Sequence, residues 1–405
     1  MSRGEQHDTG RVSAGGSVLR RFEGAHATEL YLLCCPEPGA SGDVARQAES
    51  ACRSLEAVLR AQGGTPQDIA TETVFFSNIR EDLGTYRQAR RRVFGQTDAD
   101  GVGPASTFIE QPPLAEDSAL EVAAFAVVPH DRSSAEVRYV RAPSACNCED
   151  CARVDARVSV MGGHKHLHAG NLYGANGTAF DEAYSMFCAA QELLRSAGMD
   201  FHQVVRTWIY IRDIDCDYDD LNRARRFFFE RNGIKLRPAS TGIQGGPFPA
   251  EHNFSMGLYA VAAPAPLEVH VMTTPTLNEA WMYGADFSRG LEVVEANKTA
   301  LYISGTASVD EDGRTAGVGD FASQADRMLR NVSTLLQQRG ASFADVLSAV
   351  TYLKDPADAA MLRRILRDRS LEGFPNALVR ADVCRSGLLC EMEAIAALPR
   401  RRNGN

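Results

Sequence analysis

The sequence of 405 residues has no uninterrupted apolar run of the roughly 18 residues that a membrane-spanning helix needs. Its first sixteen residues are polar and lack the apolar centre of a secretory signal peptide. Basic residues are also too few to give a positive protein, because 43 Lys and Arg stand against 52 Asp and Glu. The resulting net charge of -9 repels a phosphate backbone. We therefore expect a cytoplasmic protein that binds neither a membrane nor nucleic acid.

The rest of the composition is that of a globular protein, with 44% hydrophobic and 23% charged residues. At roughly 150 residues per domain, the length predicts two or three domains. Ten cysteines are present. Because a reducing cytosol does not maintain structural disulfides, we expect them to be free, metal-bound or catalytic.

Three segments of the chain repeat one pattern. Each begins with apolar residues at helical spacing, followed by a glycine where a helix needs a left-handed cap, and six residues later by a β-branched residue that opens a strand. A second helix, a strand that begins after a proline, and a closing strand follow in each copy. The glycines are Gly63, Gly198 and Gly340, the β-branched residues are Ile69, Val204 and Val346, the prolines are Pro104, Pro238 and Pro375, and the closing strands are 121–129, 256–264 and 391–399.

Each copy therefore predicts an α+β unit whose helices cover one face of a sheet. The other face must also be buried, so we expect the three units to pack sheet to sheet as an intramolecular pseudo-trimer, either monomeric or paired as a homodimer. The predicted units are 16–130, 156–264 and 283–400, and the predicted linkers are 131–155 and 265–282.

The segments SGTAS (304–308), VLSAVTYLKDP (346–356) and CEMEAIA (390–396) resemble the reactive intermediate deaminase (Rid, YjgF-like) superfamily, three times over. The resemblance implies the chorismate-mutase-like fold of that superfamily, whose members are typically homotrimers with ligand sites between subunits. Its imine-hydrolysing members place an arginine two residues after the proline that opens the fifth element. Here those positions are Ser106, Ser240 and Ala377, which argues against simple imine deamination.

The chorismatase branch of the superfamily is more similar. The resemblance lies in RTWIY (206–210), PASTGIQGG (238–246), LYISGTAS (301–308) and ADVCRSGLLCEMEAIA (381–396). It implies Glu391 as the catalytic general acid, and the combination of Gly305 with Cys384 looks like the type that makes 3-hydroxybenzoate. We therefore expect a cofactor-independent lyase or hydrolase of secondary metabolism that converts chorismate, a small anionic metabolite, to 3-hydroxybenzoate and pyruvate. This chain departs from the best-known members in its full-length first unit and its cysteine cluster.

The chemistry needs a carboxyl group that keeps its proton near neutral pH. Glu391 lies among apolar residues, and burial there would raise its pKa. The alternative is that Glu391 and Glu393, two apart on one strand, share a solvent-exposed face. The spacing of the units places Met256 and Glu121 at the corresponding positions of the other two, so the fold itself does not demand a carboxylate.

Two substrate carboxylates need cationic partners, and arginine offers a bidentate fork. The candidates are Arg206, Arg380 and Arg385. Arg206 lies in an apolar strand, where a structural ion pair is the alternative. The resemblance in RTWIY also makes Tyr210 a candidate for substrate binding. The remaining candidates are Thr241 and Gly242, whose backbone amides could approach an anion or simply form a turn, and Cys384, whose alternative is a buried apolar filler.

Three cysteines within six residues, Cys146, Cys148 and Cys151, suggest a structural zinc site in the first linker. His164, His166 and His168 follow at alternating positions. They are candidate ligands, or they form a polar strand face that lines the pseudo-threefold axis.

Two other functions stay open from the sequence. One is a tandem Rid-type hydrolase that acts on an imine, an enamine or another reactive biosynthetic intermediate. The other is a non-catalytic protein that binds a small metabolite between units.

Overall fold

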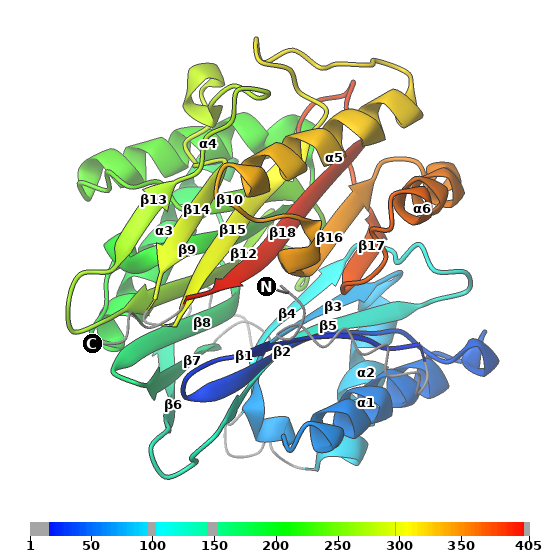
Figure 1. The fold of residues 1–405 in the computed structure, drawn as a ribbon, viewed down its shortest axis with the longest axis vertical. Helices are drawn as coiled ribbons and strands as arrows, with labels where there is room; N and C mark the ends of the chain where they lie inside the picture. The colour runs from blue at the N-terminus through cyan, green and yellow to red at the C-terminus, as the bar shows by residue number, and fades with distance from the viewer. Residues whose placement is uncertain (1–15, 96–102, 144–152, 296, 401–405) are drawn as a thin grey trace, which may run out of the picture.

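The computed structural model describes residues 16–95, 103–143, 153–295 and 297–400, which form three six-stranded sheets (Figure 1). The first sheet has the order β1-β2-β5-β3-β4-β11: β1 (Val18–Glu23), β2 (Ala27–Cys34), β5 (Leu120–Pro129), β3 (Ile69–Phe76), β4 (Ala105–Glu110) and β11 (Gly246–Pro247). The second has the order β10-β9-β12-β8-β7-β6: β10 (Ala239–Gln244), β9 (Val204–Ile211), β12 (Phe254–Ala262), β8 (His164–Leu172), β7 (Arg153–Met161) and β6 (Glu136–Pro143). The third has the order β13-β14-β15-β18-β16-β17: β13 (Glu268–Val271), β14 (Gly290–Val294), β15 (Lys298–Ala307), β18 (Cys390–Pro399), β16 (Val346–Leu353) and β17 (Asn376–Arg380).

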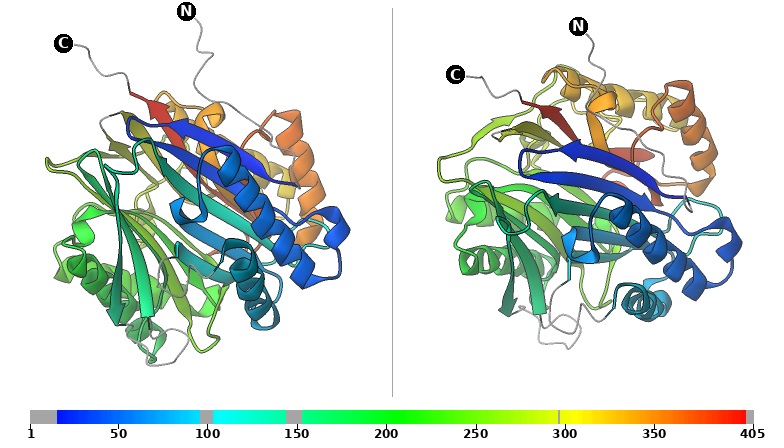
Figure 2. Two further views of the ribbon diagram at one scale, coloured as in Figure 1. Left: turned by 90° about the horizontal axis from the view of Figure 1, so that it is seen from below. Right: turned by 60° about the horizontal axis from the view of Figure 1, so that its bottom comes forward.

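The helices lie on the outside of the sheets (Figures 1 and 2). In chain order they are α1 (Val44–Ala61), α2 (Ile79–Phe94), α3 (Ala179–Ser196), α4 (Ile214–Arg231), α5 (Phe321–Gln337) and α6 (Ala359–Asp368). The 3₁₀ turns are η1 (Pro38–Ala40), η2 (Pro66–Asp68), η3 (Phe201–Gln203), η4 (Ala280–Tyr283), η5 (Phe343–Asp345) and η6 (Pro356–Asp358). No helix among the described residues is long and apolar enough to span a membrane.

The predicted repeat is confirmed in its local detail. The three β-branched residues are the first residues of β3, β9 and β16, and the three prolines immediately precede β4, β10 and β17. The predicted cap glycines have left-handed backbone angles, with φ of 73°, 68° and 72° for Gly63, Gly198 and Gly340. In the first unit, Gly63 and Gly64 donate their N–H groups to the carbonyls of Arg60 and Leu59, which closes the end of α1.

Both segments predicted as linkers contain strands. In the first, β6 pairs with β7, and in the second, β13 pairs with β14, so each extends its sheet by an edge strand. Their proline and alanine content suggested a break, but edge strands tolerate such residues because one side of the strand has no partner. The first sheet obtains its last strand, β11, from the second unit, where Gly246 pairs with Glu110.

The units pack through their inner sheet faces, as the pseudo-trimer requires. One apolar cluster joins Phe75 of the first sheet, Tyr210 of the second and Tyr352 of the third, all almost fully buried. Each sheet buries its outer face against its own helices in a separate core. The α+β class and the arrangement of three units in one chain are therefore confirmed. The seams between units are the places where side chains of different units can meet.

Candidate active site

Glu391 lies on the inner face of the third sheet. It is on β18, where it pairs with Ala307 of β15 and Tyr352 of β16. Along β18, Met392 and Ala394 enter the core beneath the helices, so the alternate residues Glu391 and Glu393 point to the face between the units. The Glu391 residue is only 5% exposed. The alternative of a solvent-exposed glutamate pair is therefore wrong.

The Glu391 carboxyl group reaches the seam between the second and third units. The carboxyl group lies next to Gly305 of β15, two residues before Ala307. The N–H of Gly305 donates to Thr241 Oγ1 of β10 at 3.0 Å. A Cβ atom at Gly305 would lie 2.0 Å from Glu391 Oε1 and 3.1 Å from Thr241 Cγ2. Glycine is therefore the residue that leaves room for the carboxyl group at this position.

The pKa of Glu391 is raised to about 8. Burial is the largest cause, because it penalises the charged carboxylate, and the negative charge of Glu393 adds to it. The charges of Arg289 and Arg206 act in the opposite direction but do not reverse the shift. The group is therefore mostly protonated at neutral pH, and it can act as a proton donor.

Arg206 is buried beside this carboxyl group, with 1% of its surface exposed. Its Nη2 donates to Thr241 Oγ1 at 2.7 Å and to Glu393 Oε2 at 2.8 Å. Trp208 Nε1 donates to the other Glu393 oxygen at 2.8 Å, and the guanidinium lies 4.8 Å from the centre of the Trp208 ring. The structure thus shows the ion pair that was the alternative for Arg206. Its contact with a substrate carboxylate stays a prediction.

Cys384 approaches the same seam from the third unit. Burial and the nearby Glu391 charge raise the pKa of its thiol to about 12, while a hydrogen bond with Tyr218 of α4 lowers it. Gly242 lies under Tyr218, where an added Cβ would be 3.3 Å from ring atom Cε2. At neutral pH the Cys384 thiol is protonated, so it contributes a neutral wall and not a thiolate nucleophile.

The other predicted binding residues are placed differently. Arg380 is exposed at the end of β17, because the alternation of that strand buries Ala377 and Val379 and turns Arg380 outward. Its backbone N–H donates to Pro112 O of the first unit, so Arg380 lies at the seam between the third and first units, and its contact with a substrate carboxylate stays a prediction. Arg385 is half-buried, and its Nη1 donates to Gly313 O at 2.6 Å.

Tyr210 is buried in the cluster that joins the three units, and a hydrogen bond with Thr73 binds its side chain to the first unit. Burial raises the pKa of Tyr210, the charge of Glu393 raises it further, and the charge of Arg206 lowers it. Tyr210 therefore lies close to the ion pair of Arg206 and Glu393, on the side of the seam that faces the centre of the three units.

The predicted zinc ligands Cys146, Cys148 and Cys151 lie outside the described residues. Among the residues that are described, no group of three or more histidine, cysteine or acidic side chains could hold a metal ion. His166 and His168 do border a cavity at the centre of the three units, as the strand-face alternative predicted.

A family model for endoribonuclease L-PSP matches residues 285–398. A RutC family protein of Pyrococcus abyssi is 33% identical over 98 residues, which cover 24% of this chain and 76% of that protein. The chain belongs to this family, the Rid superfamily.

Larger Rid relatives match more of the chain. A chorismatase of Streptomyces rapamycinicus is 26% identical over 294 residues, covering 66% of this chain and 83% of that protein. A 3-hydroxybenzoate synthase of Streptomyces hygroscopicus is 28% identical over 234 residues, which cover 50% of this chain and 66% of that protein. The crystal structure of a chorismatase superimposes with a TM-score of 0.59 at 18% identity, covering 82% of this chain and 93% of the other, which shows a shared fold.

Strand pairing corrects which residues of the three Rid units correspond. Phe75, Tyr210 and Tyr352 pair with Glu121, Ser255 and Glu391 respectively. Ser255, and not Met256, is therefore the counterpart of Glu391 in the second unit. It lies nine residues before Pro264, whereas Glu121 and Glu391 lie eight residues before the closing prolines of their units, so an alignment on the prolines is displaced by one residue. Only the first and third units carry the carboxyl group. Burial raises the pKa of Glu121 to about 7, and Cys35 and Arg363 of the third unit lie close enough to lower it.

Two side chains at this seam were not predicted from the sequence. Arg289, which precedes β14, donates from Nε to Asn278 O at 2.8 Å, and its charge reaches Glu391. Tyr218 projects from the first turns of α4 toward Cys384. An arginine between aromatic and apolar residues in FSRGLEVV was a signal of a buried cation. Tyr218 had no comparable signal, because α4 begins with an acidic, surface-like sequence.

Proposed function

We propose that this Rid protein is a chorismatase-like enzyme that converts chorismate to 3-hydroxybenzoate and pyruvate without a cofactor. The observation that carries the proposal is the burial of the Glu391 carboxyl group at the seam of two units, next to Gly305, where its pKa is raised to about 8. The similarity to a chorismatase and to a 3-hydroxybenzoate synthase supports the substrate class. The atoms of the two products add up to those of chorismate, so the reaction needs no oxidant and no net water.

In the proposed mechanism, Glu391 donates its proton to the terminal methylene of the enolpyruvyl group. The ether carbon becomes oxocarbenium-like and is attacked by water or by a ring hydroxyl. With water, the hemiketal releases pyruvate, and the ring diol then loses one water and becomes aromatic. With the ring hydroxyl, the bond between its oxygen and the ring breaks, that oxygen leaves with pyruvate, and the ring loses a proton as it becomes aromatic. The resulting Glu391 carboxylate lies buried beside the negative Glu393, an arrangement that favours return of the proton. A neutral Cys384 thiol and Gly305 shape the space beside the acid.

Arg206 and Arg289 are the cations nearest to Glu391 in this proposal. Both lower its pKa through their charge. Arg206 is held by Glu393 and Thr241, and Arg289 by Asn278. They offer positive charge to the carboxylates of chorismate, and the guanidinium planes are already fixed before substrate arrives, which lowers the entropy cost of binding.

Imine hydrolysis has less support. The three positions that correspond to the substrate-clamping arginine hold Ser106, Ser240 and Ala377. Ser106 Oγ donates to Glu72, and Thr207 Oγ1 donates to Ser240 Oγ, so both hydroxyls are used inside the protein.

The test is incubation of the purified full-length protein with chorismate, with pyruvate measured by a coupled assay and the aromatic acid by liquid chromatography. General-acid catalysis contributes about 10²–10⁴-fold, so Glu391→Gln should lower kcat at least 100-fold. Glu121→Gln is the matched control, because it removes the corresponding buried carboxyl group at a different seam, and it should leave kcat within about twofold.

Full activity of Glu391→Gln would refute the mechanism. Binding of chorismate by the wild-type protein without formation of pyruvate would instead support the non-catalytic binding role. Thermal unfolding of each variant separates loss of activity from loss of the fold.

A further inference from the structure

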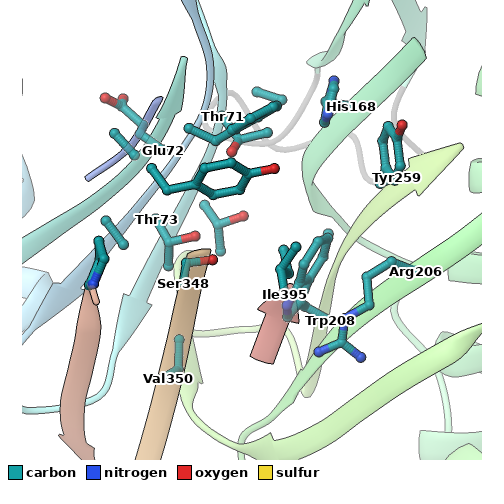
Figure 3. Close-up of a pocket in the computed structure, with 18 of the residues that line it drawn as sticks. Thr71, Glu72, Thr73, His168, Arg206, Trp208, Tyr259, Ser348, Val350 and Ile395 are labelled. Carbon is teal, nitrogen blue, oxygen red and sulfur yellow. The ribbon is translucent and has the colours of Figure 1, made fainter. Parts of the chain in front are cut away.

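A cavity of about 170 Å³ lies where the inner faces of the three sheets meet. Side chains of all three units border it, from Thr73 and Phe125 in the first unit to His168 and Tyr259 in the second and Ile395 in the third (Figure 3). Glu391, Gly305 and Cys384 do not belong to the described residues that line it. This axial cavity therefore adjoins the seam that holds Glu391, and the two share Arg206 and Glu393.

One wall of the axial cavity is a row of three side chains on adjacent strands. Tyr259 of β12 pairs with His168 of β8 on one side and with Arg206 of β9 on the other. The His168 and Tyr259 rings stack, with centres 4.7 Å apart and an angle of 24° between their planes. Figure 3 shows the three residues on one side of the cavity, with Thr71 and Glu72 on the opposite side.

Both ends of this row hold polar atoms without a partner. Within the part of the chain that the structure describes, His168 Nδ1 and Arg206 Nε and Nη1 make no hydrogen bond. His168 is 7% exposed and Arg206 is 1% exposed, so bulk water does not form hydrogen bonds with these atoms. Leaving such a buried group unsatisfied costs about 1–3 kcal/mol. Neighbouring polar groups are satisfied, as where Tyr259 Oη lies 2.8 Å from His166 Nδ1.

The size and walls of the axial cavity favour a single ring. An engineered protein cavity of about 150 Å³ takes up benzene, so about 170 Å³ holds one six-membered ring with a small substituent. Aromatic side chains border it on two sides, from Phe125 in the first unit to Trp208 and Tyr259 in the second. Such rings pack face to face or edge to face with an aromatic ligand.

The charges around the axial cavity are already neutralised within the protein. Lys298 pairs with Glu29, and Arg206 pairs with Glu393. Glu72, on the far side, pairs with Arg90. A charged ligand would lose its hydration without gaining a counter-charge, which is costly. An uncharged ligand with a hydrogen-bonding oxygen would satisfy the free Arg206 N–H groups without that cost.

We propose that the axial cavity is a second ligand site of this protein, which binds a small uncharged single-ring aromatic molecule that carries a hydrogen-bonding oxygen. The ring stacks against the Tyr259 wall, and its polar substituent accepts a hydrogen bond from Arg206. The site shares Arg206 with the proposed chorismate site, but none of its lining side chains donates the catalytic proton.

The probe is benzamide, an uncharged ring with a carbonyl acceptor, titrated calorimetrically into the full-length protein at pH 7, with benzoate as the charged comparison. Gly257 borders the cavity, and an added Cβ there would have its nearest neighbours at 3.6–3.7 Å. Gly257→Val therefore projects methyl groups into the cavity without a backbone clash. His168→Phe keeps a ring and removes the unpartnered nitrogen, so it serves as the second variant should the first fail to fold.

We expect benzamide to bind in the millimolar range or tighter, with benzoate at least tenfold weaker. Gly257→Val should weaken benzamide at least tenfold, and His168→Phe severalfold. The matched control is Gly84→Val on α2, where an added Cβ would meet nothing within 4 Å. A crystal soaked in benzamide should show its ring in the cavity.

No binding of benzamide, equal binding by all variants, or a soaked crystal with ordered water only in the cavity would overturn the proposal. Benzoate binding as tightly as benzamide would overturn the assignment of an uncharged ligand. Turnover of chorismate is measured separately, so neither result decides the other.

Discussion

The raised pKa of Glu391 predicts a change in stability with pH that glutamine at this position removes. An ordinary glutamate has a pKa of 4.5, and in the folded protein burial and the charge of Glu393 raise it to about 8. The folded state therefore binds a proton that the unfolded state has lost. This stabilisation is fully present below pH 4.5 and is lost as the pH rises through about 8. At about 1.4 kcal/mol per pKa unit, the loss between pH 6 and pH 8 is about 2 kcal/mol.

The assay is urea-induced unfolding at pH 6 and pH 8 for the wild type, Glu391→Gln and Glu121→Gln. Burial raises the pKa of Glu121 only to about 7, so its replacement should remove only about 1 kcal/mol of the pH dependence. If Glu391 is the acid, kcat should also fall about tenfold per pH unit above pH 8. An equal pH effect on the unfolding of wild type and Glu391→Gln would refute the reasoning, because the group would then titrate alike in both states.

Three further substitutions test the packing around the site. Gly305→Ala places a Cβ 2.0 Å from Glu391 Oε1, so the acid must move, and we expect kcat to fall at least tenfold with a loss of about 1–3 kcal/mol in stability; unchanged kinetics would contradict the close contact. Lys298→Met leaves Glu29 and Glu295 without their shared cation and should lower the unfolding free energy by about 3–5 kcal/mol in urea. Trp208→Phe removes the 2.8 Å hydrogen bond to Glu393. It should cost about 1.5–3 kcal/mol by the same measurement, and a variant as stable as the wild type would show that the bond is replaced.

Local signals in the sequence predicted the fold well because they act over a few residues. The cap glycines and the β-branched residues that open strands depend on backbone conformation close to them, and their positions were confirmed. The edge strands β6 and β13 were missed because their composition is that of a loop, although each pairs with the next strand along the chain.

The site was harder to predict because it depends on contacts between units. The alternation of β18 correctly placed Glu391 and Glu393 on one face, but only the packing of the sheets shows that this face is buried. The same alternation in β17 turned Arg380 outward, although its position in the sequence suggested the cleft. Arg289 was missed because its proximity to Glu391 arises from the path of β14 beside β15.

Covalent linkage of the three units has a consequence for stoichiometry. In a ring of identical subunits, any substitution occurs at every junction at once, and each junction must keep the same residues. Here the three junctions are encoded separately. The corresponding positions hold Glu391, Glu121 and Ser255, so one junction has no carboxyl group and the other two have carboxyl groups with different pKa values. A ligand for the Glu391 junction should accordingly saturate at one equivalent per polypeptide and follow a simple hyperbola.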